Sequence, residues 1–147
     1  MKRLALLVLL GAVSCGGPDV SPGGASGAHP ASLAGAAWVV ISVDGRLPVA
    51  GGEPTVAFTP AGVSGSGGCN HFGGSYRYDP ATGALEFENL AMTAMACADD
   101  RRNQFEAGFS RALQQANVAS SDELGHLILT GPGGAIVLAN GRQPLGS

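Results

Sequence analysis

Two cysteines, Cys69 and Cys97, enclose the segment that most constrains how this chain folds. Cys69 lies in a glycine-rich stretch that runs Gly67-Gly68-Cys69-Asn70-His71-Phe72-Gly73-Gly74. Glycine and Asn accept left-handed φ values at little cost, so the stretch predicts a tight turn, with Asn70 bonded to neighbouring backbone. Two strand-like runs, 75–78 and 84–89, follow around a turn at 79–83, and the segment ends in Thr93-Ala94-Met95-Ala96-Cys97.

The beginning of the sequence predicts export. Lys2-Arg3 precedes an apolar run at 4–10, which is shorter than the ~20 residues needed to span a bilayer, so residues 1–14 resemble a signal peptide. The following Ala12-Val13-Ser14-Cys15 is similar to a lipobox and predicts lipid attachment at Cys15, although its first residue departs from the usual Leu. The alternative is an ordinary secretory signal after which Cys15 carries no lipid.

An exported chain meets an oxidising compartment, where two cysteines of one small domain are most simply paired. We therefore expect a Cys69–Cys97 disulfide, which would close a loop of about 28 residues and stabilise the fold by roughly 3–4 kcal/mol. Catalysis by a Cys69 thiol with His71 as base is the weaker alternative. A thiolate needs positive surroundings, and the nearest arginine in the sequence, Arg77, lies beyond the turn.

Composition divides the rest of the chain into a tether, one domain and a tail. Residues 15–32 combine Cys15 with a Gly/Pro/Ser-rich stretch that offers almost nothing to a core, and we expect a flexible tether with a solvated His29. The domain is expected at 33–140, with Trp38 buried at its edge, and a flexible tail at 141–147. Loss of Lys2 and Arg3 with the signal would take the net charge from −3 to −5, which disfavours a nucleic-acid partner.

The domain is predicted to be mainly β (α+β): an antiparallel, β-barrel-like sheet of about seven to eight short strands with one amphipathic helix packed against it. The helix is expected at about 101–116, capped by Asp99 and Asp100, because Phe105, Phe109 and Leu113 recur at helical spacing. The expected strands are 33–43, 55–58, 62–65, 75–78, 84–89, 117–120, 126–130 and 135–140.

Four blocks of this sequence carry a recognisable pattern: Leu33-x-Gly35-x-x-Trp38, Gly67-Gly68-Cys69-Asn70-x-Phe72-x-Gly74-x-Tyr76, Leu85-x-Phe87 through Thr93-x-Met95-Ala96-Cys97, and Glu106-x-x-Phe109-x-x-x-Leu113. In this order they resemble the META domain family, the HslJ-like heat-shock lipoproteins of bacteria. The resemblance covers Leu33 to about Asn140 and implies a barrel-like sheet around or beside one helix. It also implies links to envelope stress and a fold-level similarity to lipid-anchored pilot proteins, without established catalytic residues.

The residues themselves do not specify a reaction. A zinc site built from Cys69, Cys97, His71 and His126 would have tolerable chemistry, but the spacing matches no zinc pattern, and we expect no metal and no cofactor. Ligand contact through the signature turn, at Asn70, His71 and Phe72, is the sharper alternative to a purely structural turn.

We therefore expect a monomeric, non-enzymatic envelope protein with a binding or chaperone-like role in envelope stress. Its anchor would hold it at the outer membrane facing the periplasm. One alternative is a carrier that accepts an acyl chain or apolar peptide between helix and sheet, beside Phe105 and Phe109. The other is the thiol enzyme that uses Cys69 and His71.

Overall fold

The structure, a computed structural model, describes residues 27–141. The predicted signal peptide (1–14), the predicted lipidation site Cys15, most of the predicted tether and the predicted tail from residue 142 lie outside these residues. The helix within 27–141 is neither long nor apolar enough to cross a membrane.

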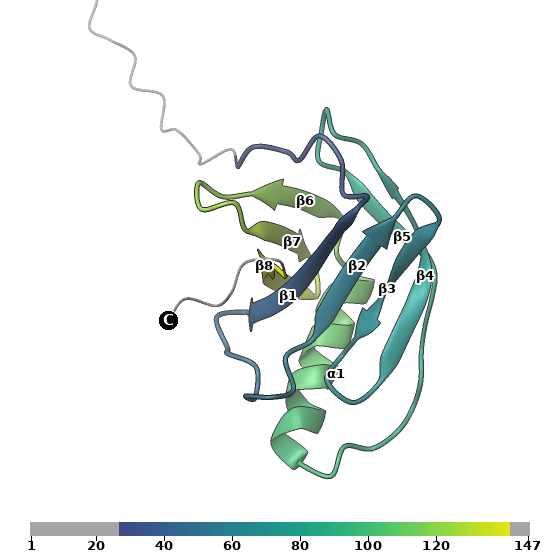
Figure 1. Cartoon of the computed structure of the whole chain (residues 1–147), viewed down its shortest axis with the longest axis vertical. Helices are drawn as coiled ribbons and strands as arrows, with labels where there is room; N and C mark the ends of the chain where they lie inside the picture. Colours follow the sequence, from purple (N-terminus) through teal and green to yellow (C-terminus); the bar gives the residue numbers. More distant parts are fainter. Residues whose placement is uncertain (1–26, 142–147) are drawn as a thin grey trace, which may run out of the picture.

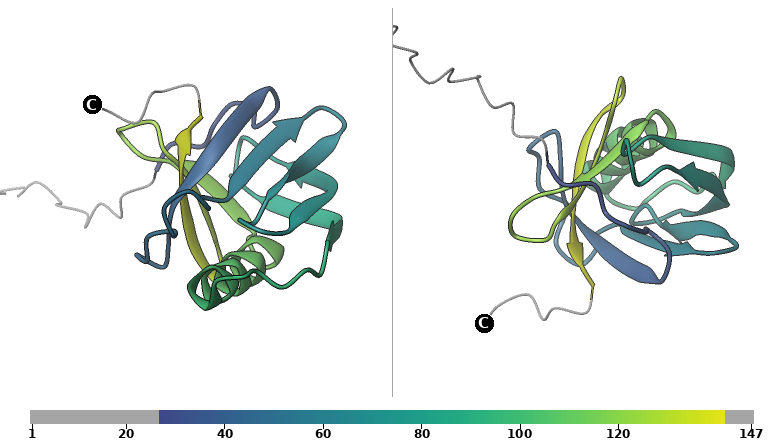
Figure 2. Two further views of the ribbon diagram at one scale, coloured as in Figure 1. Left: turned by 60° about the horizontal axis from the view of Figure 1, so that its bottom comes forward. Right: turned by 90° about the horizontal axis from the view of Figure 1, so that it is seen from above.

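All eight strands of the described region belong to one antiparallel sheet, in the order β5-β4-β3-β2-β1-β8-β7-β6. The sheet curves into a half-barrel around the single helix, as Figures 1 and 2 show, and this confirms the predicted fold class. The elements are β1 (Ala36–Val43), β2 (Thr55–Thr59), β3 (Gly62–Ser66), β4 (His71–Tyr78), β5 (Leu85–Met92), α1 (Asp100–Gln114), β6 (Val118–Ser121), β7 (Leu127–Gly131) and β8 (Gly134–Asn140).

Two β-bulges help the sheet to curve. Between Gly73 and Ser75 of β4, two residues of β5 oppose one, and the bulged Asn89 has a φ of 53°. Gly74 faces this bulge, where a Cβ would come within 2.9 Å of Glu88 O, so any larger residue would push β5 away. A second register shift, between Val40 and Ser42, bends β1 against β8.

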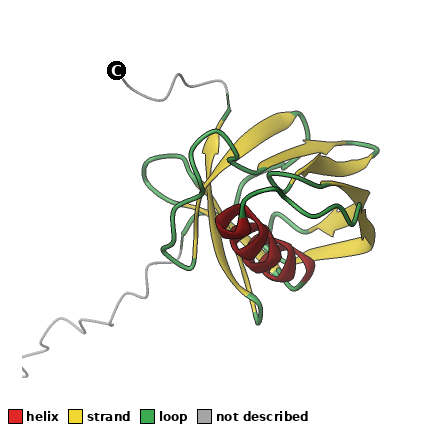
Figure 3. Cartoon of the chain, turned by 90° about the horizontal axis from the view of Figure 1, so that it is seen from below, coloured by secondary structure: helices red, strands yellow, loops and turns green. Residues whose placement is uncertain are grey.

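Helix α1 lies across the concave side of the sheet, against β8, β1 and β7 (Figure 3). Asp99 caps it by accepting a hydrogen bond from Arg101 N, and Asp100 is its first residue. The core is formed by fully or nearly buried side chains of the sheet, of α1 and of the segment before β1: Leu33, Val40, Val56, Phe58, Val63, Phe72, Leu85, Phe109, Leu113, Leu127, Leu129, Ile136 and Leu138. Trp38 is half-buried and packs against this core.

The two edge strands of the half-barrel meet at one end. Ala84 pairs with Val118 in an antiparallel bridge, Leu85 N donates to Asn117 O at 2.9 Å, and Ala119 N donates to Gly83 O at 2.8 Å. The edges β5 and β6 are therefore joined where β5 begins, and we call this junction the seam.

The predicted tether extends too far along the chain, because residues 27–30, which we call the strap, lie on the fold beside the seam. Ser121 N donates to Ala28 O at 2.7 Å, and the Tyr78 hydroxyl donates to Pro30 O at 2.6 Å. His29, expected to be free in solvent, has Nδ1 3.2 Å from Ala119 O, although its side chain is largely exposed. The strap carries few core-forming side chains, but its backbone carbonyls join it to two strands.

Candidate functional site

The glycine-rich turn before β4 is tight, but it needs less unusual backbone than its composition predicts. Gly67 N donates to Asn70 O at 2.7 Å, and of residues 67–74 Gly68 alone has a left-handed φ, of 118°. Asn70 does not adopt a positive φ. Gly67 is required for a different reason: a Cβ there would lie 2.5 Å from Glu106 Oε1, so a side chain would separate the turn from α1.

Asn70 is buried, with 6% of its surface exposed, and its side chain forms hydrogen bonds to residues distant in the sequence. Its Oδ1 accepts from Met95 N at 2.7 Å and from the Thr93 hydroxyl at 3.0 Å, while its Nδ2 donates to Met95 O at 2.9 Å. The prediction that Asn70 bonds to neighbouring backbone is therefore wrong. The side chain instead fixes both backbone groups of Met95, 25 residues away, which ties the second signature to the first.

Glu106 completes this network from α1, a role that was not predicted from the sequence. It is 6% exposed; its Oε1 accepts from Asn70 N at 2.7 Å and from Cys69 N at 3.2 Å, and its Oε2 accepts from Asn70 Nδ2 at 2.7 Å. Glu106 stands three residues before Phe109 and seven before Leu113, so it shares their buried helix face. A carboxylate that interrupts an apolar stripe was the available signal.

The predicted disulfide joins Cys69 to Cys97, with the two Cα atoms 5.7 Å apart. Asn103 of α1 fixes the second cysteine by accepting from Cys97 N at 2.7 Å and donating to Cys97 O at 3.0 Å. The bond occupies the sulfur that a Cys69 thiol enzyme would need. We call Cys69, Asn70, Cys97 and Glu106 the signature clamp.

The other predicted residues, Phe72, His71 and His126, lie in different environments. Phe72 is buried and packs against Phe109, with ring centroids 5.9 Å apart, so it is a core residue with almost no surface exposed to a ligand. His71 is exposed, and its backbone pairs with Thr93. His126 lies on the β6–β7 connection, where its Nδ1 is 2.8 Å from Asp122 Oδ2. The clamp therefore brings together Cys69, Cys97 and Asn70 of the predicted set, and neither histidine.

The clamp holds one exposed segment, residues 93–98, which we call the signature loop. Every residue of this loop except half-buried Cys97 is exposed, and the Met95 side chain is 60% exposed although both of its backbone groups are bonded to Asn70. The loop runs from the end of β5 to the start of α1, as Figure 1 shows. At its end, the pKa of Asp99 is lowered, chiefly by the hydrogen bond from Arg101 N.

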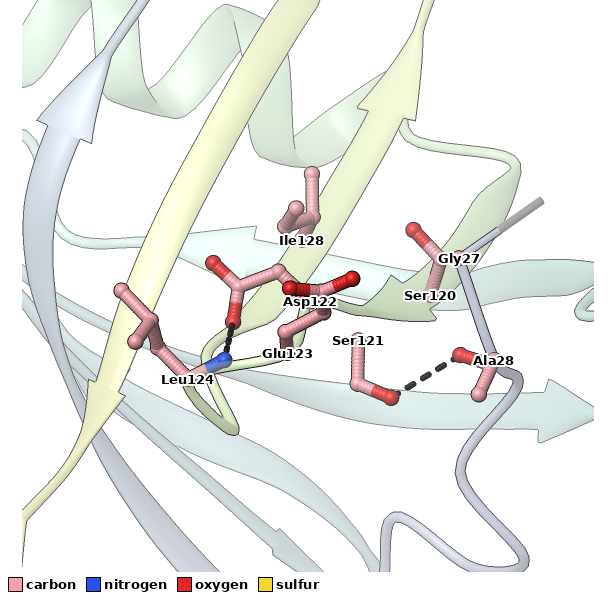
Figure 4. A pocket seen from close by; sticks show the side chains of 8 residues that line it. All are labelled: Gly27, Ala28, Ser120, Ser121, Asp122, Glu123, Leu124 and Ile128. Atoms are coloured by element: carbon pink, nitrogen blue, oxygen red, sulfur yellow. Dashed lines mark hydrogen bonds between the residues drawn. The ribbon is translucent and has the colours of Figure 1, made fainter. Parts of the chain in front are cut away.

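Two pockets of the described region are lined by strands and loops alone, and two smaller ones lie beside α1, at Phe105. A shallow one of about 690 Å³ lies between the strap and the β6–β7 hairpin, where Leu124 and Ile128 stand beside Asp122 and Glu123 (Figure 4). Another, of about 210 Å³, lies between the β1–β2 connection and Phe105. The space beside Phe109 is filled, because Phe109, Ala112 and Leu113 are completely buried.

Comparison with solved structures finds the same architecture elsewhere. An NMR structure of a protein from Burkholderia xenovorans is 24% identical, with a TM-score of 0.60, over 76% of this chain and 85% of that one. At this identity the likeness concerns the fold alone. A second protein solved by NMR is 28% identical, with a TM-score of 0.57, over 72% of this chain and 89% of that one.

No curated protein matches the sequence. The model of the META domain matches residues 31–143, which include all eight strands, the helix and the signature clamp. The match begins at residue 31, directly after the strap. The chain belongs to the META domain family.

Proposed function

We propose that this protein is a monomeric envelope lipoprotein, anchored through Cys15, whose META domain has a non-enzymatic binding or chaperone-like role in envelope stress. The lipid would hold the domain at the outer membrane, facing the periplasm. Two or more acyl chains anchor stably, since each buried CH₂ contributes ~0.8 kcal/mol.

The observation that carries the proposal is the rigid exposure of the signature loop. Met95 presents 60% of its side chain to solvent while Asn70 fixes its N–H and its C=O. A flexible, polarizable Met side chain suits binding to varied apolar surfaces, and a fixed backbone lowers the entropy that binding costs. The signature residues would thus support a contact surface, while Asn70 and Phe72 remain inside.

The carrier alternative has less support. An acyl chain or apolar peptide between helix and sheet needs a cavity of about 300 Å³ or more, and the α1 face at Phe109 and Leu113 is fully packed. The two pockets that touch Phe105 are about 210 and 40 Å³. Surface binding by the signature loop requires no opening of this core.

Aggregation of an unfolding client protein, followed by light scattering, tests the binding role. The processed protein is expected to delay aggregation, Met95→Asp to lose most of the delay, and Met95→Leu to keep it. Leu124→Asp is the matched control, because Leu124 is also an exposed apolar residue, at 79%, but lies on the β6–β7 connection. Equal behaviour of the two Asp variants, or no delay by the wild type, would reject the role of the loop.

Fractionation tests the anchor separately. Wild-type protein is expected in the membrane fraction, and Cys15→Ser is expected to leave it if its signal is cleaved. A processed Cys15→Ser chain that stays membrane-bound would exclude lipid anchoring through this residue.

A further inference from the structure

The signature clamp brings together three groups that can each coordinate a metal ion. Cys69 Sγ, Cys97 Sγ and one carboxylate oxygen of Glu106 all lie within 4.8 Å of one another. They come from three segments, the turn before β4, the signature loop and α1. In the disulfide state the sulfurs are bonded to each other, so a metal is relevant to the dithiol state of the same clamp.

The carboxylate of Glu106 has an environment suited to a cation. It is 6% exposed, and no Lys, Arg or His of residues 27–141 forms an ion pair with it. Its hydrogen-bond partners are neutral N–H groups of Cys69 and Asn70. A buried carboxylate is costly without a positive partner, and a metal ion would supply one.

The spacing already agrees with a shared ion. Cys97 Sγ lies 3.8 Å from Glu106 Oε2. Tetrahedral zinc, with Zn–S of about 2.3 Å and Zn–O of about 2.0 Å, places sulfur and oxygen ligands about 3.5 Å apart. The two sulfurs would need to separate from a bonded ~2.05 Å to about 3.8 Å, which rotation of the cysteine side chains can provide.

The groups around the carboxylate would orient it for coordination. Asn70 Nδ2 holds Oε2 at 2.7 Å, and the N–H groups of Asn70 and Cys69 hold Oε1 at 2.7 and 3.2 Å. Such outer hydrogen bonds fix a ligand's direction and commonly affect metal affinity by about 10- to 100-fold. Asn70 would therefore support the site without being a ligand itself.

We propose that the dithiol form of this protein binds one Zn²⁺ through Cys69 Sγ, Cys97 Sγ and Glu106 Oε2, with water as the fourth ligand. Two thiolates and a carboxylate fit zinc better than the hard cations, which prefer oxygen ligands alone. Binding converts two thiols into zinc-bound thiolates and releases two protons. It needs no redox reagent in a newly exported chain whose disulfide has not yet formed.

Zinc coordination and the disulfide are then two alternative ways to link Cys69 to Cys97 in the signature clamp. When an external disulfide exchanges with the zinc-bound pair, the Cys69–Cys97 bond forms, the external disulfide becomes two thiols with protons from water, and Zn²⁺ leaves. Both closures join the turn to the signature loop. The zinc form would hold the fold before oxidation, and the disulfide would hold it afterwards.

The test uses the processed protein, reduced by a phosphine, which becomes its oxide as water supplies the oxygen and the protons for both thiols. Anaerobic titration with Co²⁺ and then Zn²⁺ is expected to show one metal per chain, with thiolate-to-cobalt charge-transfer absorption that zinc abolishes. The oxidised protein is expected to show neither signal. X-ray absorption of the zinc form should find two sulfur ligands with oxygen completing the shell. Absence of sulfur, or four sulfurs, would overturn the proposal.

Variants separate the individual ligands. Cys69→Ser/Cys97→Ser is expected to abolish binding, and this variant also measures any contribution from Cys15. Glu106→Gln, checked for folding by circular dichroism, is expected to bind Zn²⁺ at least about 10-fold more weakly. Asp100→Asn, at an exposed carboxylate of the same helix, is the matched control and should bind as the wild type does. A folded Glu106→Gln with unchanged affinity would remove Glu106 from the site and overturn the proposed ligand set.

Discussion

The half-barrel is closed at two places, and the two closures use different chemistry. At the signature clamp, a disulfide and a buried network of Asn70 and Glu106 join the turn before β4, the loop after β5 and α1. At the seam, backbone groups of residues 83–85 pair with those of 117–119, and the strap adds Ala28 and Pro30 carbonyls. Figure 1 places the seam and strap at the opposite end of the sheet from the start of α1.

This difference implies unequal resistance to opening. Opening the signature clamp exposes buried polar groups and requires a covalent bond to break. The strap can detach from β4 and β6 when water replaces a few of its hydrogen bonds. We therefore expect the clamp to open with the whole fold, and the strap to open locally.

Removing the Glu106 carboxylate should have the largest effect. Glu106→Ala leaves three N–H donors of Cys69 and Asn70 without their acceptor inside the fold, and we expect the free energy of unfolding to fall by about 4 kcal/mol. Urea denaturation measures the loss. Glu86→Ala, at an exposed carboxylate on β5, is the control and should change stability by less than about 0.5 kcal/mol. Equal stability of both variants would mean that α1 does not hold the turn.

Removing the disulfide should have the next largest effect. Cys69→Ala/Cys97→Ala releases a loop closed over a sequence separation of 28, and we expect a loss of about 3–4 kcal/mol. Combining it with Glu106→Ala forms a double-mutant cycle. Because both changes act on one clamp, their effects should depart from additivity by about 0.5 kcal/mol or more. Strict additivity would show that the bond and the carboxylate stabilise separate parts of the fold.

The same contrast explains how far sequence alone could lead. The strands, the helix and the Cys69–Cys97 pair could be predicted, because apolar periodicity and cysteine count are visible in side-chain types. Asn70 and Glu106 were present in the quoted motifs, but their pairing joins residues 36 apart, and neither local spacing nor turn chemistry encodes such a distance. Helical periodicity alone does not predict that Glu106 is buried, because the N–H groups that it accepts from belong to the turn before β4.

The strap could not be predicted at all, for a physical reason. It is held by carbonyl groups of Ala28 and Pro30, and every residue has a carbonyl. A stretch of Gly, Pro and Ser predicts a tether because side chains cannot form a core, yet the edge strand β6 accepts any backbone of the right direction. A contact made by particular side chains can be inferred from residue types, whereas a contact made by backbone groups cannot.

A single hydroxyl tests the strap. Tyr78→Phe removes the 2.6 Å hydrogen bond to Pro30 O, and we expect about 1 kcal/mol of destabilisation together with faster amide exchange at Ser121, which donates to Ala28 O. Tyr76→Phe is the matched control, because the half-buried Tyr76 donates from its hydroxyl to Thr59 O at 3.2 Å in a solvent-exposed hydrogen bond away from the strap. If the amide of Ser121 exchanges only with global unfolding in both variants, the strap is as firmly held as the clamp.

Acid should affect both ends by the smallest amount. The pKa of Asp99 is lowered, chiefly by the hydrogen bond from Arg101 N, and that of Asp79, in the turn beside the seam, is lowered chiefly by the one from Ala81 N. A carboxyl whose pKa is lower in the folded state adds stability above its unfolded pKa of about 3.9, and this stability is lost as pH falls through the folded pKa.

Asn substitutions separate the charge from the hydrogen bond at each end, because an amide oxygen can still accept from the same N–H. Asp99→Asn and Asp79→Asn should lower stability slightly at neutral pH, because the contribution of the charge is lost, and should make the decline of stability below about pH 4 shallower, as urea midpoints across this range would show. Amide exchange of the same samples separates the two closures. In wild-type protein at acid pH, we expect Ala81 N–H to exchange by local opening before Cys97 N–H, since the latter is bonded to Asn103 within the clamped segment. The reverse order would mean that protonation of Asp99 loosens the start of α1 and, with it, the signature clamp. In that case the clamp would open at a higher pH than the seam.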